Sequence, residues 1–537
     1  MTGWRWRCAL LLALLLGSGA AGAATLEELV GALGSDDFGA KLAAVQQLGR
    51  LGDPRATVPL KALGEGALYT DDAHRLVIAA PAGDGFAIFD PLTRAPRGKA
   101  ARDGLDKVRV NNRLRAAVEA ALGALTLSSG QAEDRLAAAQ EALKQAPGDG
   151  GAALARALAA EQDPAVRRAL ALALAVARLG SGEEAEQRAA IAELARSSDP
   201  QIRGLLLQRR DQGALAPAVQ RALDSAVEAI DGRLRLIGLA VTLFEGVSLG
   251  SVLLLAAIGL AITFGVMGVI NMAHGEMIML GAYTTFLVQQ LFRACLPPHW
   301  LDAYLVAAVP AAFLVSAAVG IALERGVIRF LYGRPLETLL ATWGVSLMLQ
   351  QLVRSLFGAP NKEVANPAWM TGGFELIGGA IITWNRVVIL VFCFAVLGLL
   401  ALILRRTTFG LHMRAVTQNR AMAAAMGIAT ARIDALTFGL GSGIAGIAGV
   451  ALSQIGNVSP NLGATYIVDS FMVVVFGGVG SLLGTLMGAL SLGLVNKLLE
   501  PLAGAVLGKV VVLIAVILFI QKRPRGLFAL KGRAQEG

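Results

Sequence analysis

The chain has 537 residues, a length that suits three or four domains of about 150 residues each. Hydrophobic residues make up 55% of it and charged residues 16%, below the roughly 25% charge of soluble domains. The composition therefore argues against a wholly soluble or disordered protein. Three cysteines and four scattered histidines are too few for a disulfide framework or a zinc site, so we expect no metal and no cofactor.

The positive charge lies mainly in the C-terminal part. Of the net charge of +9, residues 24–235 contribute −1 and residues 236–537 contribute +8, and Arg5 and Arg7 supply the rest. Basic residues in an apolar, charge-poor region are typical of membrane spans with cytoplasmic loops. The pattern argues against nucleic acid as a partner and places a domain boundary near residue 235.

Residues 1–23 have the features of an export signal. Arg5 and Arg7 precede an apolar run at 9–16, and Ala21-Gly22-Ala23 matches a cleavage site. An uncleaved anchor is the alternative, but eight apolar residues fall short of the roughly 20 that span a bilayer. We expect the domain that follows, residues 24–235, to be periplasmic.

The predicted exported domain is mostly helical. Asp-Pro followed by a branched residue and Arg occurs at 163–167 and again at 199–203, and Pro after Asp marks a helix start. The spacing resembles HEAT-like repeats, and an ordinary alanine-rich bundle is the alternative. Two short strands are predicted at 75–79 and 85–90. We find no catalytic constellation in this domain.

From residue 247 onward the hydropathy predicts a transmembrane permease domain at 236–537, with seven to nine spans. The apolar segments lie at 247–270, 276–292, 303–323, 338–356, 387–404, 433–455 and 505–521, with a glycine-broken pair at 467–479 and 481–496. The glycine-broken pair of segments either crosses the membrane fully or is re-entrant. We therefore expect a mainly α, polytopic membrane protein.

The basic residues predict the orientation. If the first span starts outside and the broken pair returns as a hairpin, the loops near 325–334, 405–432 and 522–533 face the cytoplasm and hold most of the Lys and Arg of this region. The positive-inside rule then agrees with the export signal. We expect a multi-pass protein of the bacterial inner membrane with a cytoplasmic C-terminus.

A polar, glycine-flanked segment at 268–276 interrupts the apolar stretch 247–291. It contains Asn271, His274 and Glu276, and an ionisable group at bilayer depth costs about 2.5 to 3.5 kcal/mol. The side chains should therefore face a cavity or one another. Two interpretations stay open, a substrate pathway at a broken helix and a structural plug that satisfies freed backbone groups.

A second interruption lies near residue 478. Asp469 precedes it and joins the predicted substrate pathway, and Gly480, Gly484 and Gly488 repeat every four residues. Glycines at that spacing share one helix face, which lets another backbone approach closely. We predict helix packing for the three glycines, and the matched interruptions hint at an inverted repeat.

The loop between the spans at 387–404 and 433–455 carries a predicted short helix, 414–427, rich in alanine and methionine. Methionine and small residues make an adaptable docking surface. We predict that this loop couples to an ATPase, with Arg414 and Arg420 pairing with acidic groups of the partner. A solvated amphipathic loop is the alternative. The residues assigned to coupling are Arg414, Arg420, Ala424, Gly427 and Arg432.

Three segments in order carry a resemblance to a known family. Residues 265–283, which include the break, resemble the signature of the branched-chain amino-acid permeases of ABC importers; 408–446 resemble the coupling loop of that family, and 477–481 its late glycine-rich span. The resemblance covers about residues 245–530. Within the family, residues 519–528, the exported extension around 108–113 and the stretch around 500–501 most resemble the permeases of urea importers.

The resemblance implies a pore with defined partners. These are a second homologous permease, two cytoplasmic ABC ATPase subunits, a periplasmic solute-binding protein, membrane lipid and a small neutral solute, urea. The chain has no G-x-x-x-x-G-K-[ST] motif, so we expect a transport subunit without ATPase activity rather than an enzyme. The alternatives are a branched-chain amino-acid or short-chain amide permease, an energy-independent urea channel, and a membrane-anchored receptor.

Overall fold

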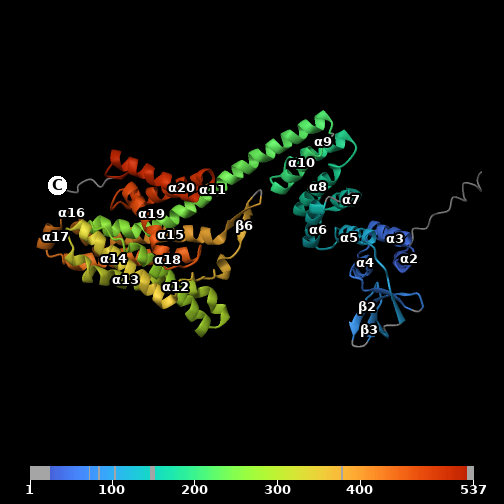
Figure 1. Ribbon diagram of the computed structural model, residues 1–537, viewed down its shortest axis with the longest axis horizontal. Coiled ribbons are helices and arrows are strands. Elements are labelled where there is room, and N and C mark those ends of the chain that lie inside the picture. Colours follow the sequence, from blue (N-terminus) through green and yellow to red (C-terminus); the bar gives the residue numbers. More distant parts are fainter. Residues whose placement is uncertain are drawn as a thin grey trace, which may run out of the picture. The chain divides into compact units, whose positions relative to one another are not determined.

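The computed structural model describes residues 25–71, 73–82, 85–101, 104–127, 129–145, 151–213, 215–376 and 379–528 (Figure 1). The predicted export signal lies outside these residues. The chain divides into two compact units, Met1–Gly232 and Arg233–Gly537. Helix α11 (Pro217–Met267) begins in the first unit and continues into the second.

The described part of the first unit is mostly helical. At two of the Asp-Pro motifs the Asp side chain accepts a backbone N–H at 2.8 Å, from Ala165 to Asp163 and from Gln201 to Asp199, because such a side chain satisfies an unpaired donor at a helix start. The helices are α2 (Leu26–Ala32), α3 (Phe38–Leu51), η1 (Pro54–Ala56), α4 (Thr57–Gly64), α5 (Asn112–Thr126), α6 (Ala132–Gln145), α7 (Gly151–Ala160), α8 (Pro164–Arg178), α9 (Glu184–Leu194) and α10 (Pro200–Asp211).

A five-stranded antiparallel sheet lies between α4 and α5 in the sequence, with the order β4-β3-β2-β1-β5. Strands β2 (Leu76–Ala82) and β3 (Gly85–Phe89) occur where two strands are predicted. Sequence reasoning missed β1 (Leu68–Asp71), β4 (Pro96–Ala100) and β5 (Leu105–Lys107). These are short and mostly polar, so they lack the alternation of a half-buried strand.

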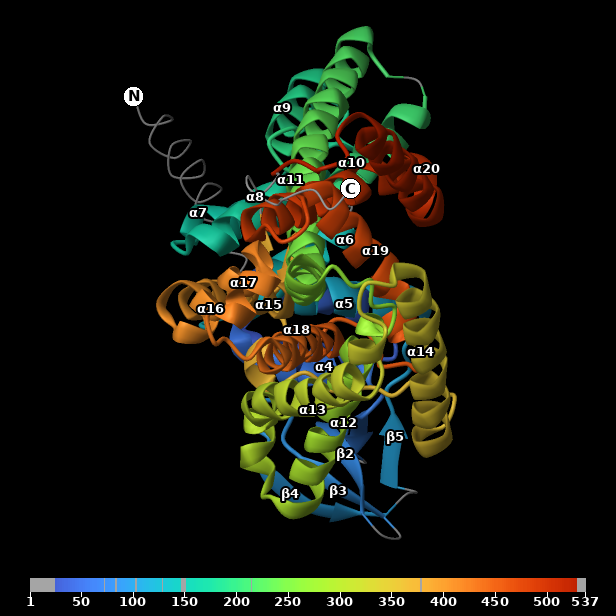
Figure 2. The same cartoon turned by 90° about the vertical axis from the view of Figure 1, so that its left-hand side faces the viewer.

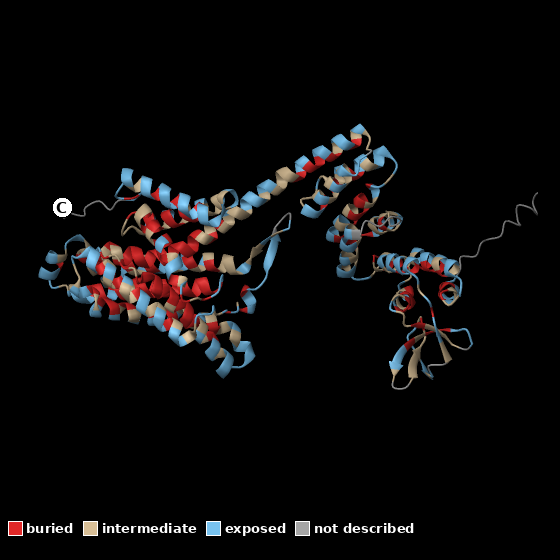
Figure 3. Ribbon diagram, in the orientation of Figure 1, coloured by how far each residue is buried: buried red, intermediate tan, exposed pale blue. Residues whose placement is uncertain are grey.

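The second unit is a helical bundle whose most buried helices are α11, α12 and α18 (Figure 3). Short 3-10 turns and one hairpin, β6 (Gly373–Leu376) with β7 (Ala380–Thr383), connect the helices. The elements after α11 are α12 (His274–Cys295), η3 (Pro298–Ala303), α13 (Tyr304–Gly326), η4 (Ile328–Phe330), α14 (Pro335–Phe357), η5 (Ala368–Met370), α15 (Trp384–Arg406), α16 (Thr408–Gln418), α17 (Arg420–Ala425), α18 (Thr430–Ser453), α19 (Leu462–Gly477) and α20 (Leu482–Lys522).

Five described helical segments are long and apolar enough to cross a membrane. They are Pro217–Met267, Pro298–Phe330, Trp384–Arg406, Thr430–Ser453 and Leu482–Lys522. Helices α12 and α14 have 22 and 23 residues and coincide with two further predicted spans, but they carry more polar side chains. The chain is a polytopic α-helical membrane protein.

Close backbone contacts between glycines hold the bundle together. A Cβ atom added to Gly281 would overlap the backbone of Gly446, and one added to Gly259 would overlap that of Gly441. Glycine is required where two backbones approach this closely. These contacts bring α18 against both α11 and α12.

Of the three glycines predicted to share one helix face, Gly484 and Gly488 lie on α20, but Gly480 lies in the turn before it with a φ of +79°, so the prediction was wrong for Gly480. All three lie at close backbone contacts. A Cβ on Gly484 would overlap the carbonyl of Gly477, one on Gly488 would lie 2.8 Å from the Val473 oxygen, and Gly480 is the residue that a Cβ on Gly265 would meet. Since 477 faces 484 and 473 faces 488, α19 and the first arm of α20 run antiparallel. Helix α20 then bends at Gly504, whose φ is +77°.

Candidate functional site

The helix break between α11 and α12 places three polar side chains in the interior of the bundle. Helix α11 ends at Met267, and Gly268 has a φ of +67°, a left-handed conformation that glycine adopts without strain. Asn271 and His274 are 0% exposed and Glu276 is 1% exposed. These three side chains are therefore buried within the bundle rather than on its outer surface.

The His274 ring faces α11, not Glu276. Its Nε2 lies 3.0 Å from the carbonyl oxygen of Ala256, and because a carbonyl only accepts, Nε2 is the nitrogen that donates. This bond ties the start of α12 to α11. His274 and Glu276 do not pair with each other, and the contact of His274 fits the structural interpretation of that residue.

Glu276 faces α14. Its Oε1 accepts hydrogen bonds from Ser346 Oγ at 2.9 Å and Gln350 Nε2 at 2.8 Å. One turn earlier on α14, Thr342 Oγ1 accepts the backbone N–H of Met272 at 3.1 Å. Sequence reasoning missed these three α14 residues, although polar residues spaced four apart in a predicted span would have indicated them.

Three polar atoms at the break have no partner among the described residues. Asn271 Oδ1 accepts the Ala273 N–H at 3.0 Å, but Asn271 Nδ2, His274 Nδ1 and Glu276 Oε2 are buried without a hydrogen bond. Buried polar atoms in native proteins almost always have a partner. The break therefore offers one donor, Asn271 Nδ2, and two acceptors, His274 Nδ1 and Glu276 Oε2, for a polar molecule.

Asp469 lies at a different contact from the break. Lys509 of α20 donates to its carboxylate at 3.0 Å, and the Asp469 side chain is 8% exposed. A buried carboxylate that is already paired is less suited to binding a solute. Asp469 thus pairs with Lys509 and, among the described residues, forms no hydrogen bond or ion pair with Asn271 or Glu276, with which the sequence had grouped it.

The coupling loop contains two short helices where the sequence predicts one. Asn419 has an extended backbone and its side chain accepts the N–H of Met422 at 2.9 Å, so it caps the start of α17 and ends α16. Gly427 follows α17 with a φ of +85°. The prediction of a continuous helix over 414–427 was wrong because the asparagine cap competes with helix continuation.

Both arginines assigned to the partner are used inside the chain. Arg414 donates to the carbonyl of Leu404. Arg420 pairs with Asp434 of α18, and its guanidinium lies 4.3 Å from the ring centre of Tyr332. Ala424, Gly427 and Arg432 are exposed, as are Met422 at 59% and Met426 at 76%. The exposed surface of this loop therefore combines apolar methionines with exposed arginines such as Arg414 and Arg432.

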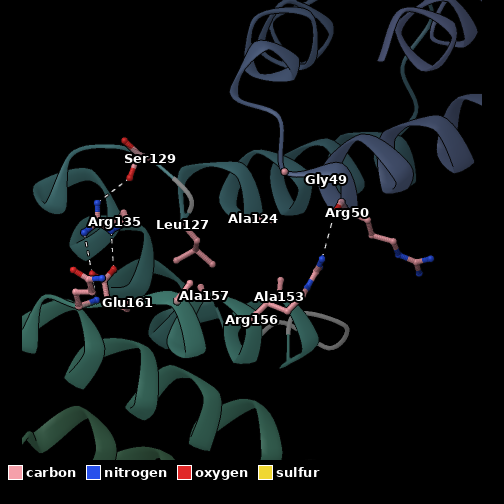
Figure 4. A pocket seen from close by; sticks show the side chains of 13 residues that line it. Gly49, Arg50, Ala124, Leu127, Ser129, Arg135, Ala153, Arg156, Ala157 and Glu161 are labelled. Atoms are coloured by element: carbon pink, nitrogen blue, oxygen red, sulfur yellow. Dashed lines mark hydrogen bonds and ion pairs between the residues drawn. The ribbon is translucent and has the colours of Figure 1, made fainter. Parts of the chain in front are cut away.

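A cavity of about 460 Å³ lies in the first unit between α5, α6 and α7 (Figure 4). Arg135 donates to both oxygens of Glu161 at 2.7 and 2.9 Å, and Arg156 reaches the carbonyl of Arg50 at 3.3 Å. The bonds from Arg135 and from backbone N–H groups lower the pKa of Glu161 to about 2. The charges of Arg135 and Glu161 in the lining of the cavity thus neutralise each other.

The chain is similar to permease components of amino-acid transport systems. The family model for the branched-chain amino acid transport system permease component matches residues 242–521. LivH of Salmonella typhimurium, a high-affinity branched-chain amino acid permease protein, is 32% identical over 293 residues, which are 53% of this chain and 94% of LivH. BraD of Pseudomonas aeruginosa is 32% identical over 291 residues, with the same coverage.

A more distant relative is the probable LivH of Methanocaldococcus jannaschii, which is 28% identical over 301 residues, 52% of this chain and 88% of that protein. No solved structure matches the chain at a significant level. All three relatives are named as transport permeases, and their similarity accounts for about half of this chain.

Proposed function

This chain belongs to the family of branched-chain amino acid transport system permease components, and on that premise we propose that it is the membrane permease subunit of an ATP-driven importer of urea. Its partners in this proposal are a second homologous permease, two cytoplasmic ATPases and a periplasmic binding protein. Residues 24–235 form the periplasmic domain, and the C-terminus is cytoplasmic.

The observation that carries the proposal is the buried, incompletely paired polar break in an otherwise apolar bundle. Broken helices at membrane depth are where transporters bind solutes, and Asn271, His274 and Glu276 each have an unused hydrogen-bonding atom there. Urea is small and neutral and has both donors and acceptors. The resemblance of residues 519–528 and of the exported extension to urea permeases supports this substrate.

The loop α16–α17 is the proposed site of energy coupling. It lies at the same end of the second unit as the final residues of α20, opposite the β6–β7 hairpin (Figure 1), and this end is cytoplasmic in the proposed orientation. Closure of the ATPases would move α17. Its link through Arg420 to Asp434 would then tilt α18, which packs against α12.

A branched-chain amino acid permease is the second candidate. The names of LivH and BraD favour it, and the match covers 94% of each of them. The two candidates share the membrane fold and the coupling loop. They differ in the solute that the path accepts.

Uptake in cells separates the candidates. We expect a strain that lacks this chain to lose uptake of labelled urea and to regain it with the chain restored, and an excess of leucine not to compete. Loss and recovery of leucine uptake with unchanged urea uptake would overturn the urea assignment and support the second candidate.

A further inference from the structure

Helix α14 carries a polar stripe on its inner face. Thr338, Thr342, Ser346 and Gln350 follow one another at intervals of four residues, and the first three are 1%, 0% and 6% exposed. Residues four apart lie on one face of a helix. The other face of α14 is apolar and exposed, at Leu340, Met348 and Leu356 among others, and α14 lies at the edge of the bundle (Figure 2).

The middle of this stripe contacts the broken segment. Thr342 accepts the N–H of Met272, and Ser346 and Gln350 both donate to Oε1 of Glu276. The two donors fix one oxygen of the carboxylate, so the other oxygen is held in a defined direction. Within the described residues that other oxygen, Oε2, is buried and unpaired.

Two of the three unused atoms at the break are complementary to an amide. Glu276 Oε2 accepts an N–H, and Asn271 Nδ2 donates to a carbonyl oxygen. An amino acid zwitterion would also need a cation for its carboxylate, and among the described residues no Lys or Arg hydrogen-bonds to the break. Arg354, the next residue of the α14 stripe, donates to Asn461 instead.

We propose that Asn271 and Glu276 form a subsite for the C=O and N–H groups of a neutral urea or amide, and that Ser346 and Gln350 are positioning residues that orient Glu276. The proposal rests on the proposed function and adds to it the atoms that select the solute. In this proposal α14 contributes to the selection of the solute and does not only cross the membrane.

The test measures the KM and maximal rate of labelled urea uptake by the assembled transporter in cells. The substitution is Gln350→Leu, and the matched control is Gln351→Leu on the exposed side of the same helix. Because Glu276 loses one of its two hydrogen-bond donors in a buried position, we expect Gln350→Leu to raise KM about tenfold with little change in maximal rate. The control variant, Gln351→Leu, should leave the KM and the maximal rate of urea uptake unchanged.

Ser346 provides a second, milder test. Ser346→Ala should raise KM, and Ser346→Thr, which keeps the hydroxyl, should restore it. Acetamide in excess should compete with urea, whereas tetramethylurea, which has no N–H, should not. Unchanged KM in both Gln350→Leu and Ser346→Ala, or equal competition by tetramethylurea, would overturn the subsite while leaving urea transport established.

Uptake by the wild-type transporter distinguishes a failure of the proposed function from a failure of the proposed subsite. A wild-type transporter that imports leucine and no urea would overturn the proposed function itself, and the subsite with it. Urea uptake that is normal in wild type and in every α14 variant would overturn only the subsite.

Discussion

The Arg135–Glu161 pair of the first unit shows how a buried charge depends on its partners. Glu161 has a side chain 4% exposed and accepts two bonds from Arg135 and backbone N–H groups of Gln162 and Asp163. These bonds favour the ionised carboxylate, so the pKa of Glu161 falls from 4.5 to about 2. The ion pair therefore stabilises the folded state at any pH at which Glu161 is ionised in both the folded and the unfolded chain.

This shift predicts a pH-dependent effect of Glu161→Gln. Because the folded pKa is depressed, the contribution of the pair to stability is complete above about pH 4.5 and is lost as the pH falls towards 2. We expect Glu161→Gln to lower the thermal unfolding midpoint of the full chain at pH 6 and to have little effect near pH 2. The control is Glu193→Gln, at an exposed ion pair with Arg196. A Glu161 effect that is constant over this range would contradict the argument.

Glu276 is the residue on which the substrate pathway depends most. Glu276→Gln replaces an acceptor oxygen by a donor where an N–H of the solute is expected, so urea uptake should fall about tenfold or more at unchanged membrane level. The control is Glu337→Gln, which removes an exposed carboxylate at the start of α14. Unchanged transport by Glu276→Gln would favour a structural plug.

At the scale of elements, the bundle depends on glycines that have no room for a side chain. Gly281→Ala would push a methyl group into the backbone of Gly446, and neither backbone can yield as a flexible side chain would. We expect a loss of about 3 kcal/mol in stability, measured as thermal unfolding of the chain in detergent.

The matched control for this packing is Gly398→Ala in α15, where an added Cβ has no atom within 4 Å. Alanine favours helix over glycine by about 1 kcal/mol, so this variant should be at least as stable as wild type. Equal effects of the two substitutions would contradict the packing account.

The coupling loop depends on the backbone conformation of Gly427. At a φ of +85° a β-branched residue is strained even though the space around Gly427 is open. Gly427→Val should therefore reduce ATP-driven uptake severalfold without loss of membrane insertion, whereas Gly427→Asn, which tolerates this region, should retain most of it. Normal uptake by Gly427→Val would overturn the role of the loop as a lever.

The sequence predicts most helices of the second unit because apolar periodicity and length are local properties. Each apolar segment that we expect from residue 247 onward coincides with a helix or with an arm of α20. The site is less predictable because its contacts join residues far apart in the sequence. Glu276 meets Gln350 and Asp469 meets Lys509 across 74 and 40 residues. Spacing within α14 indicates a polar face there, but it does not indicate which distant residue that face meets.

At the scale of the whole molecule, the net charge of +9 combines a near-neutral first part, residues 24–235, with a basic membrane domain, residues 236–537. The relatives account for the membrane domain only, since they match about half of the chain. Residues 24–235 lie outside the residues, 242–521, that the family model matches. Docking of the binding protein is the role that we propose for them, on the basis of their periplasmic location in the proposed orientation.

We propose that the chain provides a path for urea that opens at the expense of ATP hydrolysed by a separate subunit. The most direct measurement is uptake of labelled urea by proteoliposomes that contain the assembled transporter and its binding protein, with ATP or a non-hydrolysable analogue on the ATPase side. The account predicts accumulation with ATP and none with the analogue. Equal urea entry under both conditions would contradict it and identify an energy-independent channel.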